Sequence, residues 1–155
     1  MTPAVVAARR AGVACRVLAY PHDTASRAFG LEAANALGVD AAQVFKTLVV
    51  AESGGELLVA VIPAAARLDL KGLASAVAAK KAALADPPAA ERATGYVVGG
   101  ISPLGQRRRL RTFLDESALT YEEIYVSAGK RGLEIALHPL DLVRLTQAAV
   151  TRIAR

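Results

Sequence analysis

The chain has 155 residues, with 19 Lys and Arg against 14 Asp and Glu, which gives a formal net charge of +5 and a pI near 9.7. This length suits one domain with its own core, and the single cysteine, Cys15, excludes an intramolecular disulfide framework. The basic balance favours a polyanionic partner such as nucleic acid, whereas the absence of Trp argues against a platform that stacks several bases. No long apolar run marks a signal peptide or a membrane span, so we expect a cytoplasmic protein with no membrane partner.

The N-terminal part of the chain predicts two helices and three strands. Thr2 can cap a helix that has Pro3 at its first position and stops at Gly12. In the next segment a period of two places Val13, Cys15 and Val17 on one face, and we interpret the Cys15 thiol as a core group of a strand. The elements that follow the first helix are a strand over 13–20, a helix over 31–37 ended by Gly38, and strands over 44–51 and 57–62 joined by a hairpin at 53–55.

The C-terminal part predicts more strands than helices. The spacing of Leu70, Leu73, Val77 and Leu84 fits an amphipathic helix over 70–84, which the prolines after Asp86 then break. The further elements are a short helix over 89–93, strands near 96–98, 112–114, 123–127 and 133–137, and a last helix opened by Pro139. Short turns join many neighbouring strands, so we expect one α+β domain over 1–155, with a mixed, mostly antiparallel sheet flanked by helices.

Glycines are concentrated in the segment Gly99-Gly100-Ile101-Ser102-Pro103-Leu104-Gly105. Glycine takes positive φ and lets a ligand approach the main chain, which suits amides that must point at an anion or a carbonyl oxygen. Taken alone, the segment is also typical of a tight turn, because Gly and Pro commonly separate elements. Both interpretations stay open at this level.

Two charged residues lie within apolar strands. Lys46 alternates with Leu48 and Val50, so its ammonium shares a face with apolar groups unless it reaches water at the end of the strand. Glu134 points away from the apolar residues of 133–137, which also fits the solvent face of an edge strand. A buried cation or acid needs a partner or a task, so both are candidate site residues.

Several common reaction types lack the residues that they need. The turn over 126–132 has a hydroxyl and two cations, but it lacks the spacing of a P-loop, and the dinucleotide fingerprint is also missing. His22 and His138, with one cysteine, offer no metal-ligand pattern, so we expect neither a metal nor another cofactor. Neither Ser102 nor Ser127 lies in a nucleophile elbow, which argues against a catalytic triad.

Several segments together match one known family, in the expected order and along nearly the whole chain. They are Met1-Thr2-Pro3-Ala4, Val44-Phe45-Lys46-Thr47-Leu48, Ala85-Asp86-Pro87 and the runs over 94–106 and 124–135. A lysine-bearing strand followed by a long Gly-Gly-Ile-Ser-Pro-Leu-Gly segment is specific to the YbaK family and its editing-domain relatives, and the chain resembles them. This resemblance implies a barrel-like editing-domain fold, similar to the insertion domain of bacterial prolyl-tRNA synthetases.

The resemblance also implies an activity. YbaK-like proteins act in trans to clear mischarged Cys-tRNA(Pro), with Cys-tRNA(Cys) as a further candidate substrate. In the family the cysteine thiol of the substrate attacks its own aminoacyl ester and releases tRNA and a thiolactone, so the protein needs no nucleophile. Catalysis then rests on holding thiol and carbonyl together and on donors aimed at the oxyanion. The implied partners are the acceptor end of an aminoacylated tRNA and prolyl-tRNA synthetase.

Roles for individual residues follow from the same resemblance. The catalytic candidates are Lys46, near the terminal adenosine, and the backbone amides around Gly99, Gly100 and Ile101, as an oxyanion hole. The candidates for binding the aminoacyl group are Tyr20, Phe29, Thr47, Ser127, Ala128, Gly129 and Glu134. The candidates for binding the tRNA stem are Arg107, Arg108, Arg109, Lys130 and Arg131.

Two positions depart from the family pattern. Many relatives have Gly-Gly-Lys-Arg-Gly-Leu-Asp where this chain has Ala128-Gly129-Lys130-Arg131-Gly132-Leu133-Glu134. The chain thus adds a methyl in the turn and lengthens the acidic arm by one methylene, and either change can reshape the amino-acid pocket. If Glu134 holds the α-ammonium of the substrate, its longer arm must fold back or shift the amine.

Two alternative functions stay open: a water-using editor of another small amino acid such as alanine or serine, and a non-catalytic module that binds tRNA or a synthetase.

Overall fold

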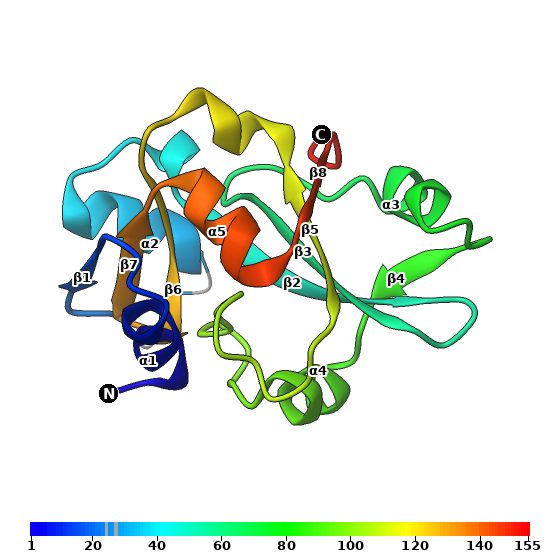
Figure 1. Ribbon diagram of the computed structural model, residues 1–155, viewed down its shortest axis with the longest axis horizontal. Helices are drawn as coiled ribbons and strands as arrows, with labels where there is room; N and C mark the ends of the chain where they lie inside the picture. The colour runs from blue at the N-terminus through cyan, green and yellow to red at the C-terminus, as the bar shows by residue number, and fades with distance from the viewer. Residues whose placement is uncertain (24, 27) are drawn as a thin grey trace.

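The computed structural model describes residues 1–23, 25, 26 and 28–155 as an α+β fold with two sheets (Figure 1). The helices are α1 (Pro3–Arg10), α2 (Phe29–Leu37), α3 (Leu70–Ala76), α4 (Pro87–Thr94) and α5 (Pro139–Thr146), with short 3-10 helices η1 (Ala41–Gln43) and η2 (Glu116–Thr120). The strands are β1 (Cys15–Ala19), β2 (Phe45–Glu52), β3 (Leu57–Pro63), β4 (Ala82–Leu84), β5 (Arg111–Asp115), β6 (Ile124–Lys130), β7 (Leu133–Leu137) and β8 (Ala149–Thr151). In the described part of the chain, no helix is both long enough and apolar enough to cross a membrane.

The two sheets are mixed overall and mostly antiparallel, as predicted. The smaller sheet has the order β1-β7-β6, and both of its pairs are antiparallel. The larger sheet has the order β4-β2-β3-β5-β8, with β2 antiparallel to β3 and β4, and with β5 parallel to β3 and β8. The expected barrel is wrong, because within the described residues β2 and β6 are joined by an isolated bridge, Val44 to Tyr125, and not by a continuous ladder.

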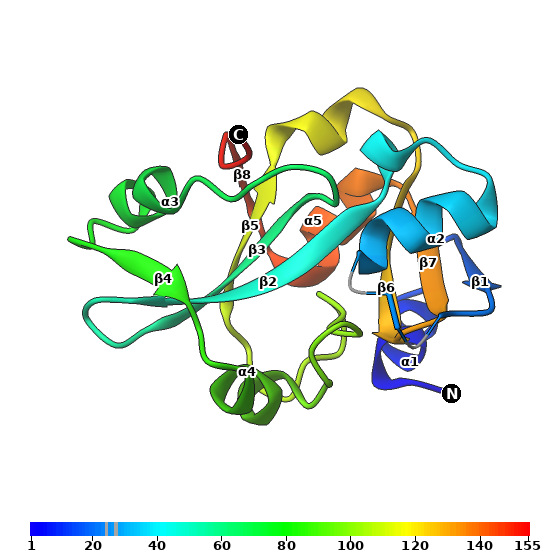
Figure 2. The ribbon, with the colours of Figure 1, turned by 180° about the vertical axis from the view of Figure 1, so that it is seen from behind.

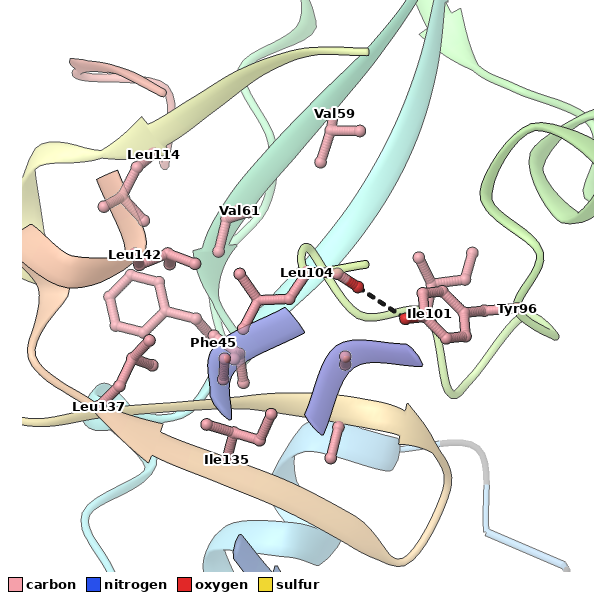
Figure 3. Close-up of a cluster of buried hydrophobic side chains, with 14 of the residues drawn as sticks. Phe45, Val59, Val61, Tyr96, Ile101, Leu104, Leu114, Ile135, Leu137 and Leu142 are labelled. Atoms are coloured by element: carbon pink, nitrogen blue, oxygen red, sulfur yellow. Dashed lines mark hydrogen bonds between the residues drawn. The ribbon is translucent and has the colours of Figure 1, made fainter. Parts of the chain in front are cut away.

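The main hydrophobic core fills the space between the sheets (Figure 3). Phe45 and Val61 of the larger sheet pack in one buried cluster with Ile135 of the smaller sheet, and α1 and α5 add side chains to it. The Tyr96 hydroxyl donates a hydrogen bond to the Leu104 carbonyl at 2.6 Å, which ties the glycine-rich loop to this core. Packing against a rigid core therefore fixes the position of the loop.

The predicted helix ends and hairpin are confirmed near the N-terminus. Thr2 caps α1, since its Oγ1 accepts a hydrogen bond from the Val5 amide at 3.3 Å. Gly38 ends α2 with a φ of 67°, which is the left-handed conformation that glycine adopts readily. The expected strand over 13–20 is shorter than predicted, and Cys15 is half-buried against the main core.

Two predicted elements are wrong. The helix over 70–84 ends as α3 at Ala76, the chain turns through Ala78 with a φ of 57°, and its last residues form β4 on the edge of β2. Local helix preference of Ala and Lys is overridden here by the hydrogen bonds that a sheet edge offers. The expected strand over 96–98 is irregular backbone instead, whereas α4 begins at Pro87 because Asp86 accepts a hydrogen bond from the Ala89 amide at 3.1 Å.

Candidate functional site

A pocket of about 620 Å³ lies where α2, β2, α4, the glycine-rich loop and the smaller sheet meet. Figure 2 shows α2 and β2 on the near side, with α4 and the loop beside them. The volume is in the range of sites for small organic ligands, and most of the wall is apolar. The polar side chains in the wall are those of Tyr20, Lys46, Thr47, Ser127, Arg131 and Glu134.

Strand β2 meets the pocket along its edge. The five consecutive residues 45–49 all line the pocket, although successive side chains of a strand point to opposite faces. Lys46 is half-buried, and burial lowers the pKa of its ammonium group. Within the described part of the chain it forms no salt bridge, so the pocket wall holds a cation without a protein counterion.

Glu134 places an acid in the part of the wall that comes from the smaller sheet. It lies on β7 beside Ser127 of β6, and it is only 6% exposed, so the alternative of a solvent-facing edge strand is wrong. Burial raises the pKa of its carboxyl group to about 8, which favours the protonated form of the acid near neutral pH. Burial also raises the pKa of Tyr20, and the nearby charge of Glu134 raises it further.

Arg131 is part of the pocket wall and not of an open surface. Its guanidinium lies 4.5 Å from the centre of the Phe29 ring and 3.2 Å from a carboxylate oxygen of Glu32. It also donates hydrogen bonds to the carbonyls of Ser26, at 3.0 Å, and Asp23. These contacts hold the start of α2 against the β6–β7 turn, and a contact of Arg131 with the tRNA stays a prediction. Glu32 was not among the predicted site residues, because its partner Arg131 is distant in the chain.

The glycine-rich loop offers fewer free amides than expected. The Gly100 amide donates to the Val97 carbonyl at 2.9 Å, and Gly100 does not line the pocket. A Cβ at Gly100 would lie 2.8 Å from the Lys130 Cα, so this glycine serves close packing instead of the expected oxyanion hole. Gly99 and Ile101 do line the pocket, and within the described residues their amides donate to no acceptor. Within the glycine-rich loop, these two amides can donate to a ligand.

Two expected substrate-binding residues lie outside the pocket wall. The register shifts between Ser127 and Lys130, and this bulge turns Ala128 into the main core, where it is fully buried. The Thr2 hydroxyl donates to the Ala128 carbonyl, and a Cβ at Gly129 would meet the Tyr96 ring at 2.7 Å. Ala128 therefore packs in the main core, and a role of either residue in binding the substrate stays a prediction.

Two exposed cations of the loop that leads to β5 lie away from the pocket. Arg108 and Arg109 line a second hollow of about 180 Å³, bounded by α1 and α5. Both helices are on the near side in Figure 1, whereas α2 and β2 are on the near side in Figure 2. Arg107 and Lys130 are exposed, and within the described residues none of these four cations forms a salt bridge.

Sequence analysis also missed an apolar wall of the pocket. Leu84 and Ala85 follow the edge of β2, and Pro87 and Ala90 of α4 extend the same wall. The continuous helix that the sequence predicts over 70–84 would have placed Leu84 elsewhere. Asp86, with two prolines after it, was the available signal that a second helix starts at this point.

Comparisons with known proteins give a consistent result. Residues 27–145 match the family model described as an aminoacyl-tRNA editing domain. The chain is 42% identical over 120 residues to EbsC of Enterococcus faecalis, which is named as a Cys-tRNA(Pro)/Cys-tRNA(Cys) deacylase, and the match covers 77% of this chain and 73% of that protein. It is also 26% identical over 111 residues to the uncharacterized protein YwhH of Bacillus subtilis, covering 72% of this chain and 70% of that protein.

Solved structures of similar proteins share the fold over the full length. One is described as a trans-editing enzyme for prolyl-tRNA synthetase, and it matches with a TM-score of 0.82 and 28% identity, covering 100% of this chain and 99% of that one. Another is the hypothetical protein APE2540, with a TM-score of 0.90 and 25% identity, covering 99% of this chain and 100% of that one.

Proposed function

Because the chain belongs to the aminoacyl-tRNA editing domain family, we propose that it is a trans-editing deacylase that removes cysteine from mischarged Cys-tRNA(Pro). Residues 1–155 act as one editing domain, and Cys-tRNA(Cys) is a second substrate. The observation that supports this most directly is the pocket, which combines a buried acid with a cation and two backbone amides that have no partner among the described residues. Its volume suits an aminoacylated adenosine better than an amino acid alone.

The substrate supplies the nucleophile in the proposed reaction. The Sγ of its cysteine attacks the carbonyl carbon of the aminoacyl ester, and the bond from that carbon to the ribose oxygen breaks. The ribose oxygen takes up the thiol proton, so the products are tRNA and a cysteine thiolactone. The pocket contributes by holding thiol and carbonyl in contact, which can lower a barrier by several kcal/mol. The amides of Gly99 and Ile101 stabilise the oxyanion that develops on the carbonyl.

Two of the charged residues in the pocket wall, Lys46 and Glu134, orient the substrate. Lys46 binds the terminal phosphate or the ribose 2′-hydroxyl, for which an ammonium supplies both charge and hydrogen bonds. Glu134 accepts hydrogen bonds from the α-ammonium of the aminoacyl group, whose positive charge lowers the pKa of the carboxyl and favours its ionised form. Phe29 and Tyr20 complete the wall around the amino acid.

The exposed cations form the surface that binds the tRNA. Arg107, Arg108, Arg109 and Lys130 bind phosphates of the tRNA, a contact that is sensitive to salt and reads little sequence. Because these contacts say little about tRNA identity, prolyl-tRNA synthetase supplies that identity as a partner. The expected place of this reaction is the cytoplasm.

The test is release of labelled amino acid from Cys-tRNA(Pro) and Ala-tRNA(Pro), measured with the native protein, Lys46→Ala and a matched control, Lys71→Ala. Lys71 is an exposed lysine of α3 outside the pocket, so its variant should retain native activity. We expect selective cleavage of the cysteinyl ester and its loss in Lys46→Ala. Cleavage of the alanyl ester instead would indicate a water-using editor, and cleavage of neither would favour a binding module.

A blocked substrate isolates the chemical step. S-methylcysteinyl-tRNA(Pro) keeps the shape of the amino acid but has no thiol to attack the ester. We expect it to compete with Cys-tRNA(Pro) for binding while its own ester stays intact. Cleavage of the blocked ester at the native rate would contradict the thiol-assisted mechanism.

A further inference from the structure

Thr47 is a pocket residue whose hydroxyl has no partner. It lies in β2 and lines the pocket, and its Oγ1 is the buried side-chain polar atom without a hydrogen bond among the described residues. Leaving a buried hydroxyl unpaired destabilises a folded protein, because the group loses its hydrogen bonds to water. A ligand in the pocket is the partner that such a group can gain.

The hydrogen bonds of the ladder show which way the backbone of Thr47 faces. The Val44 carbonyl accepts a hydrogen bond from the Ala64 amide at 2.7 Å, and the Glu52 amide donates one to the Glu56 carbonyl at 3.0 Å. The backbone groups of the even-numbered residues of β2 therefore form hydrogen bonds with β3. The backbone N–H and C=O groups of the odd-numbered residues between them point to the opposite edge of the strand, where the Val49 carbonyl accepts a hydrogen bond from the Ala85 amide at 2.9 Å.

Part of that opposite edge is open. Strand β4 pairs only with Val50–Glu52. Within the described residues, this leaves the N–H and C=O of Thr47 and the N–H of Val49 without a strand beside them. The pocket lies along this open stretch. The edge therefore presents adjacent donors and acceptors to whatever occupies the pocket.

We propose that this edge of β2 binds the adenine of the terminal adenosine of the tRNA, an inference that rests on the proposed function. An adenine presents its N6 amino group, a donor, next to a ring nitrogen acceptor, either N1 or N7. A strand edge that offers a C=O next to an N–H is complementary to this pattern. Guanine and hypoxanthine present a carbonyl oxygen at position 6, so they lack the donor on either edge.

The surroundings of the edge suit a flat aromatic ring. Leu84 and Val98 line the pocket and are 57% and 47% exposed, so the walls beside the edge are apolar and not yet covered. Covering them with a base removes apolar surface from water. Lys46, next to Thr47 in the strand, is then near the ribose and phosphate of the same nucleotide.

The test compares cysteinyl esters of tRNA(Pro) that end in adenosine, inosine, 1-deazaadenosine or 7-deazaadenosine. We expect inosine to lower kcat/KM by roughly 10- to 100-fold, and one of the two deaza bases to lower it by about 5- to 20-fold. The deaza base that is affected identifies the ring nitrogen bound to Thr47. Equal rates with adenosine and inosine, or native rates with both deaza bases, would overturn the inference while the proposed function stands. Failure to cleave the adenosine ester would overturn the proposed function itself.

The substitution Thr47→Val tests the role of the Thr47 hydroxyl in binding the substrate. Valine has the same shape, so we expect the free energy of unfolding to stay the same or rise, while KM for the adenosine ester rises about fivefold with little change in kcat. Thr151→Val, in β8 outside the pocket, is the matched control and should change neither. A Thr47→Val variant with native KM would show that the hydroxyl has no part in binding.

Discussion

Lys46 and Glu134 line the same pocket, yet within the described residues they form no ion pair with each other or with a third group. Burial is the cause of the pKa shift of each group, and it favours the neutral form of both. Two unpaired ionisable groups in one cavity destabilise the empty protein. Such a cost is typical of functional sites, where the ligand supplies the missing charges.

The two groups belong to different sheets, Lys46 to β2 and Glu134 to β7, which gives the pocket a direction. An aminoacyl-adenosine has its positive charge at the α-ammonium and its negative charge at the phosphate of the nucleotide. Opposite ends of one ligand can therefore satisfy Glu134 and Lys46 at the same time, since both residues line this pocket. The proposed orientation follows from this complementarity.

Replacing Lys46 by methionine should separate stability from activity. Lys46→Met keeps the length of the side chain and removes a half-buried charge, so we expect the free energy of unfolding to stay the same or rise. We expect kcat/KM for Cys-tRNA(Pro) to fall on the order of 100-fold. Urea unfolding and deacylation assays on the same preparation check both. A variant that is less stable and equally active would contradict the role of this lysine.

Glu134 should make stability depend on pH. Below about pH 4.5 the carboxyl is protonated in both the folded and the unfolded chain, but between about 4.5 and 8 only the unfolded chain ionises. The contribution of Glu134 to the free energy of unfolding is therefore full at low pH, falls as the pH rises through this range, and levels off above it. Glu134→Gln should match the native protein at pH 4.5 and be more stable by roughly 2–4 kcal/mol at pH 9. Equal stability of the two proteins at pH 9 would show that the carboxyl is not desolvated.

Local signals in the sequence predict much of the fold. The cap at Thr2, the glycine at 38 and the hairpin at 53–55 depend on short-range backbone geometry, and each was predicted correctly. Strand β4 could not be predicted, because its residues favour helix and become a strand only beside the edge of β2. The parallel strand β8 was missed for the same reason, since its pairing with β5 depends on a contact between distant segments.

The sequence predicts which residues belong to the candidate site better than it predicts how they are arranged in space. Lys46 and Glu134 are conspicuous in the sequence as charges within apolar strands, and both line the pocket. Which amides of the glycine-rich loop are free depends on the turn that Gly100 closes with Val97, which no spacing reveals. The bulge in β6 likewise decides that Ala128 enters the core. Tertiary contacts fix both features.

Gly100→Ala should lower stability and activity together. The added methyl would lie 2.8 Å from the Lys130 Cα, a backbone atom that cannot move away cheaply. We expect a loss of about 1–3 kcal/mol in the free energy of unfolding, with lower kcat because the Gly99 and Ile101 amides shift. Gly54→Ala is the matched control, since its methyl would meet the flexible carboxylate of Glu52. Similar effects of the two substitutions would argue against close packing at Gly100.

Arg131 and Glu32 should be coupled energetically. Their side chains are only 16% and 13% exposed, and Arg131 also stacks on Phe29, so Arg131→Lys loses a planar group that lysine cannot replace. We expect a loss of about 1–2 kcal/mol in the free energy of unfolding and a higher KM, because the start of α2 forms part of the pocket wall. A double-mutant cycle with Glu32→Gln measures the coupling between the two side chains.

Arg144→Lys provides the control for this pair. Arg144 also pairs with an acid, Asp141 at 3.4 Å, but its side chain is 64% exposed, and surface pairs contribute below about 1 kcal/mol. We therefore expect the coupling of Arg131 with Glu32 to exceed that of Arg144 with Asp141, and only the first pair to affect KM. If the two pairs gave equal coupling and native KM values, Arg131 would be free of the wall and available for the tRNA.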